Sequence, residues 1–346
     1  MHLRLGFIGF GVVAQGVVQI LHEKAALLRE RYALELSIVG IAGRSRGSIY
    51  DPDGLPLDLL LKAVEDDVHL EALDAPETGW DGVQLATASN ADIIVEMSPT
   101  DIASGQPATE YVKAALAAGK HVVTTNKGPV VTDYMAVKEL AAANGVQFRC
   151  EGTVMSGTPV IDFAERNLAG CRIDRIRGIL NGTTNYILTE MEAGMSYAEA
   201  LRRAQELGYA EADPTADVNG RDALAKVVIL ADLVMGANLQ LDEVTCTGIT
   251  EITESQIQDA LAQGRRWKLI AELERDGDTV RGSVTPKQVD LHDPLASIGG
   301  ATNAITFSTD LLGDVTVVGA GAGRLETGFS VLADILEIAR GVGGER

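Results

Sequence analysis

Cysteine and histidine are scarce in this chain, and their scarcity excludes several kinds of site. Three cysteines and five histidines occur among the 346 residues. The cysteines, at Cys150, Cys171 and Cys246, are far apart and form none of the C-x-x-C spacings that bind zinc or cycle a disulfide. The histidines are scattered, without metal-ligand spacing. We therefore expect the cysteines to be small buried hydrophobic residues and predict no zinc site.

Basic residues and long apolar runs are also in short supply. Acidic residues outnumber basic ones by 49 to 29, and the formal charge of −20 creates a field that repels nucleic acid and anionic membranes. The richest apolar run, 227–235, is interrupted by Asp232 and falls short of the roughly 18 to 20 residues of a membrane span. The first residues lack the pattern of a signal peptide. We expect a soluble, cytoplasmic protein with no nucleic-acid or membrane partner.

Short apolar strands alternate with helical segments through residues 1–150. Such alternation implies a parallel sheet, and the length and 46% hydrophobic content of the chain suggest two domains with ordinary cores. The stretch 46–82 is rich in Pro, Gly and Asp, and its periodicity is too weak to assign elements. The strands are expected at 3–8, 34–42, 92–96, 121–124 and 146–150, with helices at 12–29, 107–118 and 131–143.

The alternation stops after Cys150, and we expect a second domain to begin there. A polar, glycine-containing loop at 151–159 comes first. Further on, 266–274 and 279–289 alternate like a hairpin around Asp276-Gly277-Asp278, which is a turn signal. Helices are expected at 186–193, 197–207, about 221–235 and 325–339.

A glycine-rich turn follows the first predicted strand. Gly9-Phe10-Gly11-Val12-Val13-Ala14 fits the dinucleotide fingerprint G-x-G-x-x-G/A. Alone, the pattern is also compatible with a mere tight strand-to-helix turn. Its context favours a nucleotide site, because a strand precedes it, a helix follows, and a second strand closes the unit. Phosphate would then meet the positive end of the helix, with Gly9, Gly11, Val12 and Val13 at the cofactor.

The second predicted strand ends in Ala42-Gly43-Arg44-Ser45-Arg46. A site for NAD usually carries an acidic residue here to accept the ribose hydroxyls. Two guanidinium groups instead suit the 2′-phosphate of NADP, because arginine binds phosphate bidentately. We predict NADP as the preferred cofactor, held by Arg44 and Arg46. NAD is the alternative if these arginines are solvated loop charges.

The overall prediction is an α/β fold in three parts. A Rossmann-type, parallel-sheet nucleotide-binding domain occupies 1–150, and an α+β substrate domain occupies 151–310. The segment 311–346 returns to the nucleotide domain through its amphipathic helix.

Four carboxylates precede or begin the helix at 221–235: Glu211, Asp213, Asp217 and Asp222. Such a cluster is usually a solvated loop. Here, however, Asp222 and Lys226 lie one turn apart in a helix that is apolar nearly all round, which indicates burial. A buried ion pair is costly unless it is hydrogen-bonded or used, and burial can tune a lysine for proton transfer. We therefore favour a catalytic interpretation.

The run 204–226 resembles the signature of the homoserine dehydrogenase family throughout. Similarity to that family extends over nearly the whole chain. Further matching segments are the turn at Gly9–Ala14, Thr124-Thr-Asn126-Lys127, Glu151 to Pro159, Asn181 to Tyr186, Asn303-Ala304 and Gly319 to Gly323.

This resemblance implies reversible NAD(P)-dependent reduction of L-aspartate 4-semialdehyde to L-homoserine, a step of threonine and methionine biosynthesis. Lys226 would donate the proton to the substrate oxygen, and Lys127 would lie where cofactor and substrate meet. The substrate-binding residues would be Glu211 and Asp222, with Asp213 and Asp217 shaping an acidic pocket around the substrate ammonium.

The resemblance also implies further ligand sites and an assembly. Ser98, Gly208 and Gly321 would lie near the nicotinamide cofactor, and a homodimer would form through the second domain. A monovalent cation such as sodium would be bound by oxygens of Glu151, Val154, Ser156 and Thr158, which suit a hard cation.

Two other functions are compatible with these patterns. One is a related dehydrogenase that acts on another small amino acid or aldehyde. The other is a nucleotide sensor that has lost turnover, but Lys127 and Lys226 argue against it because a sensor does not transfer protons.

Overall fold

The chain folds into two units and passes between them twice. The computed structural model describes residues 1–342. Unit 1 contains Met1–Gly157 and the chain from Gly323 on, and unit 2 contains Thr158–Ala322. The predicted boundaries at 150 and 311 are therefore shifted. The first shifts because the Glu151 amide donates to Asp334 Oδ2 at 3.0 Å within unit 1. The second shifts because Gly313–Ala320 pairs as a strand in unit 2.

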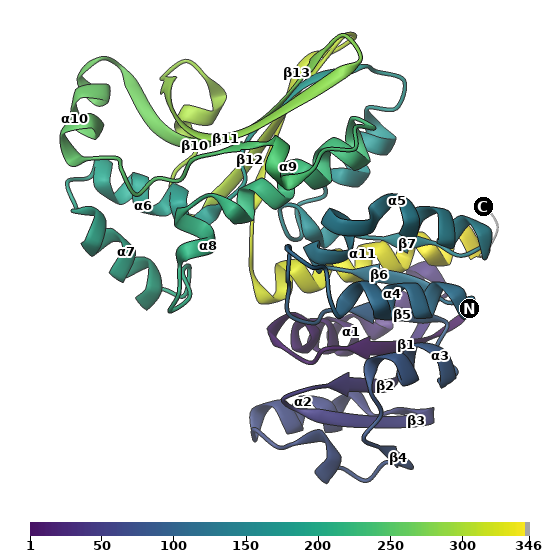
Figure 1. Cartoon of the computed structure of the whole chain (residues 1–346). Helices are drawn as coiled ribbons and strands as arrows, with labels where there is room; N and C mark the ends of the chain where they lie inside the picture. Colours follow the sequence, from purple (N-terminus) through teal and green to yellow (C-terminus); the bar gives the residue numbers. More distant parts are fainter. Residues whose placement is uncertain (343–346) are drawn as a thin grey trace. The chain divides into compact units, whose positions relative to one another are not determined.

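Unit 1 is built on a seven-stranded sheet with the order β4-β3-β2-β1-β5-β6-β7 (Figure 1). Strands β2, β1, β5, β6 and β7 run parallel, which confirms the predicted α/β fold. Strands β3 and β4 add an antiparallel edge from the stretch that the pattern left unassigned. The strands are β1 (His2–Ile8), β2 (Glu35–Gly43), β3 (Gly47–Leu55), β4 (Glu77–Thr78), β5 (Ile93–Glu96), β6 (His121–Thr124) and β7 (Phe148–Arg149).

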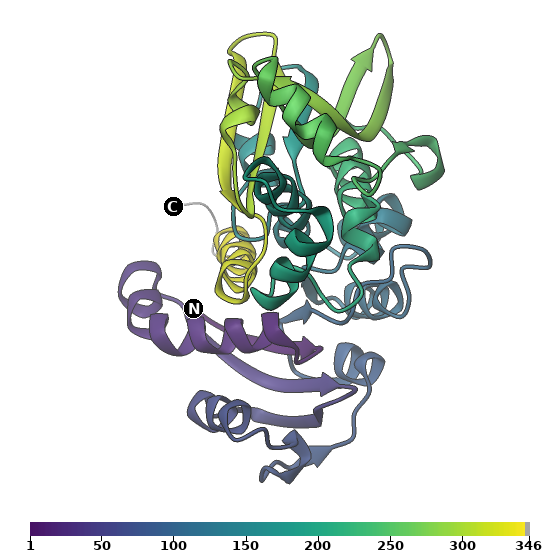
Figure 2. The ribbon, with the colours of Figure 1, turned by 90° about the vertical axis from the view of Figure 1, so that its left-hand side faces the viewer.

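Helices cover both faces of this sheet. One core joins strand residues to α1 (Val12–Tyr32), α2 (Leu57–Glu65) and α11 (Arg324–Val342). The other joins them to α3 (Gly82–Ala88), α4 (Ala108–Ala117) and α5 (Lys127–Ala143). Figures 1 and 2 show α11, in yellow, beside the purple α1, and residues of both helices share one core. The last helix thus completes a layer of the nucleotide-binding unit.

Unit 2 contains a six-stranded sheet with the order β13-β12-β8-β10-β11-β9. The predicted hairpin is confirmed, because Asp276 of β10 pairs with Thr279 of β11 across the turn. The strands are β8 (Ile173–Ile179), β9 (Thr245–Cys246), β10 (Arg265–Asp276), β11 (Thr279–Asp290), β12 (Thr302–Thr309) and β13 (Gly313–Ala320). The helices are α6 (Gly182–Glu192), α7 (Tyr197–Glu206), α8 (Thr215–Val218), α9 (Arg221–Val234) and α10 (Glu254–Ala262).

Single helical turns connect some of these elements. They are η1 (Leu70–Ala72), η2 (Glu151–Thr153), the π turn η3 (Phe163–Asn167), η4 (Leu241–Glu243) and η5 (Pro294–Ser297).

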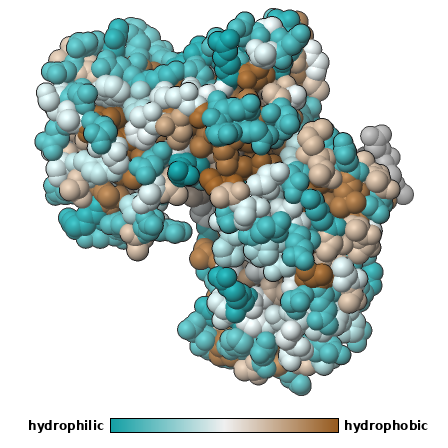
Figure 3. Space-filling model, in the orientation of Figure 1, coloured by the Kyte–Doolittle hydropathy of each residue, from teal (hydrophilic) through white to brown (hydrophobic). Residues whose placement is uncertain are grey.

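Both units expose mainly polar residues. On the face shown in Figure 3, hydrophilic residues lie between smaller apolar areas. Within residues 1–342, no helix has the length and apolar character needed to span a bilayer.

Candidate active site

The glycine turn of unit 1 leaves the amino terminus of α1 accessible. Gly9 has φ +93°, and a Cβ on it would lie 2.6 Å from the Met97 carbonyl oxygen, so a larger residue does not fit. Gly11 caps α1 without a side-chain hydrogen bond, and a Cβ on it would meet no described atom within 4 Å. The space beside Gly11 is therefore open, and the first amides of a helix, which have no partner within the helix, suit a pyrophosphate. These residues fit a dinucleotide.

Two arginines occupy the turn between β2 and β3. Arg44 is exposed, whereas Arg46 forms an ion pair with Asp67 at 2.8 Å. Such surface pairs contribute only about 0 to 1 kcal/mol, so a phosphate could still recruit Arg46. The structure thus makes Arg44 the more available of the two predicted phosphate ligands.

The carboxyl ends of β5 and β6 hold Ser98 and Lys127. The Ser98 amide donates to Glu96 Oε1 at 2.8 Å. Asn126 begins α5 by accepting from the Gly128 amide at 2.9 Å, which makes Lys127 the first residue of that helix. Glu96 is fully buried, and burial raises its pKa. Glu96 is not among the predicted site residues, although a carboxylate at the end of an otherwise apolar strand is a recognisable signal in the sequence.

In unit 2, Lys226 lies in the buried helix α9, and the predicted burial is confirmed. The residue is only 6% exposed. Lys226 Nζ donates to Asp222 Oδ2 at 2.8 Å and to the Leu180 carbonyl oxygen at 2.6 Å. Residues on every side of this helix are buried, so the ammonium is held in a largely dry environment. Two fixed acceptors orient it.

Asn181 connects the carboxylates around this lysine. Its side-chain amide nitrogen donates to Asp217 Oδ1 at 2.6 Å and to Asp222 Oδ2 at 3.0 Å. Its amide oxygen accepts from the Thr184 amide at 2.9 Å and so caps α6. Burial and, next, the charge of Asp222 raise the pKa of Asp217. The sequence pattern places Asn181 only within a segment that matches the family, whereas its hydrogen bonds show that it contacts both carboxylates of this cluster.

The other two predicted carboxylates lie outside this cluster. Glu211 and Asp213 are exposed on the loop between α7 and α8. Asp213 Oδ1 accepts from the Thr215 amide at 3.1 Å, and hydrogen bonds from Thr215 lower the pKa of Asp213. The structure therefore gathers Asp217, Asp222 and Lys226, while the substrate roles of Glu211 and Asp213 stay predictions.

Two predicted cofactor glycines also lie in unit 2. Gly208 has φ +77° and directly follows the last turn of α7. Gly321 lies against Asn303, since a Cβ on Gly321 would come within 2.1 Å of the Asn303 amide nitrogen. Both positions thus require glycine for local reasons, and their contact with a cofactor stays a prediction.

The predicted cation ligands belong to the first crossing between the units. Glu151, Val154 and Ser156 lie in unit 1, and Thr158 begins unit 2. Ser156 has φ +55°, and its hydroxyl lies 2.7 Å from that of Thr327. In residues 1–342 no cluster of three or more His, Cys, Asp or Glu could hold a metal. A cation bound here would depend on carbonyl and hydroxyl oxygens, which fit sodium.

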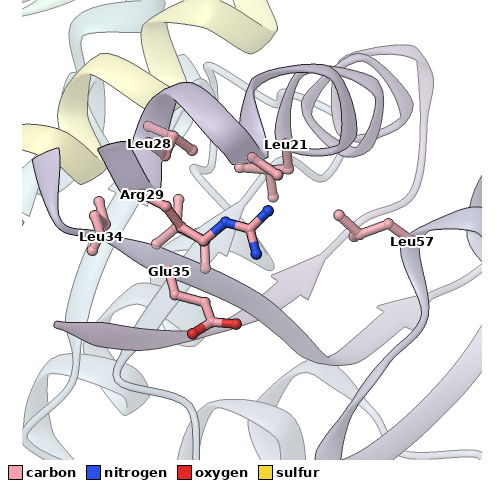
Figure 4. A pocket seen from close by; sticks show the side chains of 8 residues that line it. Leu21, Leu28, Arg29, Leu34, Glu35 and Leu57 are labelled. Atoms are coloured by element: carbon pink, nitrogen blue, oxygen red, sulfur yellow. The ribbon is translucent and has the colours of Figure 1, made fainter. Parts of the chain in front are cut away.

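A small hollow lies beside the carboxyl-terminal half of α1 and does not belong to this site. Leucines line it together with Arg29 and Glu35, which are both exposed (Figure 4). Its volume is about 110 Å³, less than the roughly 300 Å³ at which ordinary ligand pockets begin. The glycine turn is at the other end of α1, so the hollow does not bind the dinucleotide.

The fold and the residue clusters of the two units, each taken by itself, define a class of protein. A glycine turn at the carboxyl edge of a parallel sheet is the dinucleotide-binding arrangement of Rossmann domains. Together with a buried lysine and carboxylate cluster in the second unit, it defines an NAD(P)-dependent oxidoreductase.

Comparison with known proteins identifies the family. Residues 9–151 match the model described as "Homoserine dehydrogenase, NAD binding domain", and residues 159–336 match the one described as "Homoserine dehydrogenase". The chain belongs to the homoserine dehydrogenase family, which confirms the resemblance of its motifs.

Relatives and solved structures agree. The NAD(+)-dependent homoserine dehydrogenase of Pseudomonas canavaninivorans is 43% identical over 97% of this chain and 96% of its own length. The homoserine dehydrogenase of Methanocaldococcus jannaschii is 40% identical over 96% and 97%. A hyperthermophilic archaeal homoserine dehydrogenase mutant, solved in complex with NADPH, superimposes with a TM-score of 0.84 at 30% identity, covering 98% of both chains.

Proposed function

We propose that the chain interconverts L-aspartate 4-semialdehyde and L-homoserine by hydride transfer, with Lys226 as the proton donor in the reducing direction. One observation carries this assignment: a buried ammonium held between a carboxylate and a backbone carbonyl. An ammonium has three donors, and two are engaged here, which leaves one for a substrate oxygen. The matching relatives, each named a homoserine dehydrogenase, support the substrate.

The reaction needs a proton at the oxygen where charge develops. The nicotinamide cofactor, when bound, supplies or accepts the hydride. In reduction, Lys226 protonates the developing alkoxide, and in oxidation it removes the hydroxyl proton. Lys127 stabilises the same oxygen as a second cation.

The carboxylates provide the substrate's counter-charge. Asp217 and Asp222, joined by Asn181, offer oxygens to the substrate ammonium beside the Lys226 side chain. Glu211 and Asp213, on the exposed loop before α8, complete the acidic binding surface when substrate is present. This complementarity favours an amino acid over a simple aldehyde or alcohol.

For the cofactor, we propose a preference for NADP that rests on Arg44, with Arg46 as a secondary ligand. The pyrophosphate meets Gly9, Gly11, Val12 and Val13. Ser98, Lys127, Gly208 and Gly321 approach the nicotinamide end. The NADPH-bound archaeal neighbour supports NADP, whereas the name of the Pseudomonas relative favours NAD.

Three further properties complete the proposal. A monovalent cation such as sodium binds the oxygens of the 151–158 loop and stiffens it. The chain forms a homodimer through unit 2. It works in the cytoplasm on small molecules of threonine and methionine biosynthesis.

The decisive experiment measures nicotinamide absorbance with L-homoserine as the only oxidisable compound. Reduction of NADP, accompanied by aspartate semialdehyde, supports the proposal. Tight cofactor binding without turnover on either cofactor favours the nucleotide sensor instead. Turnover with another amino alcohol, and none with homoserine, favours the related dehydrogenase. Light scattering tests the dimer, and replacing sodium with a bulky organic cation tests the cation site.

A further inference from the structure

Glu96 is a buried acid at the carboxyl edge of the unit 1 sheet, and the mechanism does not use it. Its exposed fraction is 0%. One carboxyl oxygen, Oε1, accepts from the Ser98 amide at 2.8 Å and also from the Ser98 hydroxyl. The other, Oε2, lies 2.9 Å from the hydroxyl oxygen of Thr124 on the neighbouring strand. The side chain therefore joins the ends of β5 and β6.

The contacts of the Thr124 hydroxyl group indicate whether Glu96 carries a proton. The Thr124 hydroxyl oxygen lies 3.0 Å from the Glu96 carbonyl oxygen and 2.9 Å from Glu96 Oε2. It also accepts from the Asn126 amide at 3.0 Å. A hydroxyl has one proton to donate. The Glu96 carbonyl oxygen also accepts from the Thr125 amide at 3.3 Å. If Glu96 were ionised, the single Thr124 proton would have to serve both the Glu96 carbonyl oxygen and Oε2, and one of these two short contacts would have no proton of its own.

Protonation of Glu96 on Oε2 places a proton in both short contacts of the Thr124 hydroxyl oxygen. Thr124 then donates to the Glu96 carbonyl oxygen and accepts from both the Glu96 carboxyl and the Asn126 amide. Burial acts in the same direction, because it raises the pKa of Glu96. Hydrogen bonds from Ser98, Thr124 and Asn126 lower the pKa, but burial is the larger effect.

We propose that Glu96 is a neutral carboxylic acid that positions the cofactor-facing ends of β5 and β6. The side-chain Nδ2 of Asn126 donates to the Ser98 carbonyl oxygen at 3.0 Å and so joins Asn126 to the same hydrogen-bond network. Asn126 also caps α5, so the network sets the start of the helix that carries Lys127. The effect on catalysis rests on the proposed roles of Ser98 and Lys127, whereas the protonation state does not.

The first experiment compares Glu96→Gln with Glu96→Met. Glutamine reproduces the neutral acid, because its oxygen can accept from Ser98 and its NH₂ can donate to Thr124. It should keep kcat/KM within about threefold of the natural enzyme, while methionine should lower it about tenfold or more and raise KM for the cofactor. Equal losses in both variants would show that the charged form is needed and overturn the proposal.

A second experiment detects the proton on the Glu96 carboxyl group directly. Infrared difference spectra between the natural protein and Glu96→Gln, with isotope-labelled glutamate, should show the carbonyl stretch of a protonated acid at neutral pH. A carboxylate band in its place overturns the proposal. This measurement needs no turnover, so it remains decisive even if homoserine is not the substrate.

A matched pair of variants separates positioning from stability. Thr124→Val removes the hydroxyl group that contacts Glu96. Thr109→Val is the control, because it removes another buried hydroxyl group of unit 1, which donates to the Gly105 carbonyl oxygen at 2.9 Å. Both should lower Tm, but only Thr124→Val should raise KM for the cofactor, by about fivefold or more. The same KM in both variants would mean that the network does not position the site.

Discussion

The Lys226 ammonium lies 2.8 Å from the Asp222 carboxylate, one turn earlier in the same buried helix. Desolvating such a pair costs several kcal/mol per ion in real proteins, and apolar residues of similar size are often at least as stable. Stability alone therefore does not explain this pair. The proposed role of Lys226, an ammonium that contacts a substrate oxygen, would explain it.

Replacing Lys226 tests this directly. Lys226→Ala should lower turnover by about a hundredfold or more, because the proton donor is lost, and leave cofactor affinity nearly unchanged. Stopped-flow kinetics and cofactor titration measure the two effects. Lys268→Met is the matched control, since Lys268 is another buried lysine of unit 2, bound to Asn185 and the Ile298 carbonyl oxygen. Turnover at the natural rate in Lys226→Ala contradicts the assigned role.

The two glycines of the nucleotide turn should respond differently to alanine. In Gly9→Ala the Cβ would collide with the Met97 carbonyl oxygen at 2.6 Å in a left-handed backbone, so unfolding should occur at a clearly lower temperature. In Gly11→Ala the Cβ enters open space. Its Tm should stay within about 2 °C, while cofactor Kd rises about tenfold because the methyl group occupies the pyrophosphate's approach. Calorimetry and titration distinguish the two, and an unchanged Kd in Gly11→Ala argues against the turn as the pyrophosphate site.

Most of the fold could be predicted from periodicity, and the exceptions have physical reasons. Buried parallel strands give short apolar runs, so the strand at His121–Thr124 agrees with its predicted bounds. The stretch 46–82 gave no clear pattern because its strands form an antiparallel edge, one of them only two residues long. The second crossing was placed too early because β13, an exposed edge strand, lacks the alternation of a half-buried one.

The site could be predicted where charged residues interrupt an otherwise apolar pattern. Asp222 and Lys226 stand out in an otherwise apolar helix, and the structure joins them. Asn181 and Glu96 were not recognised, because their importance depends on partners far away in the sequence: Asp217 is the partner of Asn181, and Thr124 that of Glu96. Local spacing does not reveal such contacts.

Asp232 should make stability depend on pH. Burial raises its pKa from 3.8 to about 7. An acid whose folded pKa is raised contributes stability that is fully present below pH 3.8 and is lost as pH rises through about 7. Asparagine does not titrate and can still accept from the Leu239 amide. The free energy of unfolding of Asp232→Asn, relative to the natural protein, should therefore rise across this window in urea titrations.

The exposed Asp259 of α10 provides the baseline for that measurement. Asp259→Asn removes the same charge from the surface of the same unit, so it reports the general effect of net charge. A pH dependence of Asp232→Asn that merely parallels that of Asp259→Asn would mean that Asp232 ionises freely.

Cofactor preference should depend on Arg44 more than on Arg46. Arg44 is exposed, whereas Arg46 already pairs with Asp67. Arg44→Ala should weaken NADP binding about tenfold or more and change NAD binding little, because only NADP carries the 2′-phosphate. Arg46→Ala should have a smaller effect of the same kind, and the double variant should bind the two cofactors with similar affinity. Equal losses for NAD and NADP in Arg44→Ala would show that this turn does not recognise the phosphate, and the preference for NADP would then lose its basis.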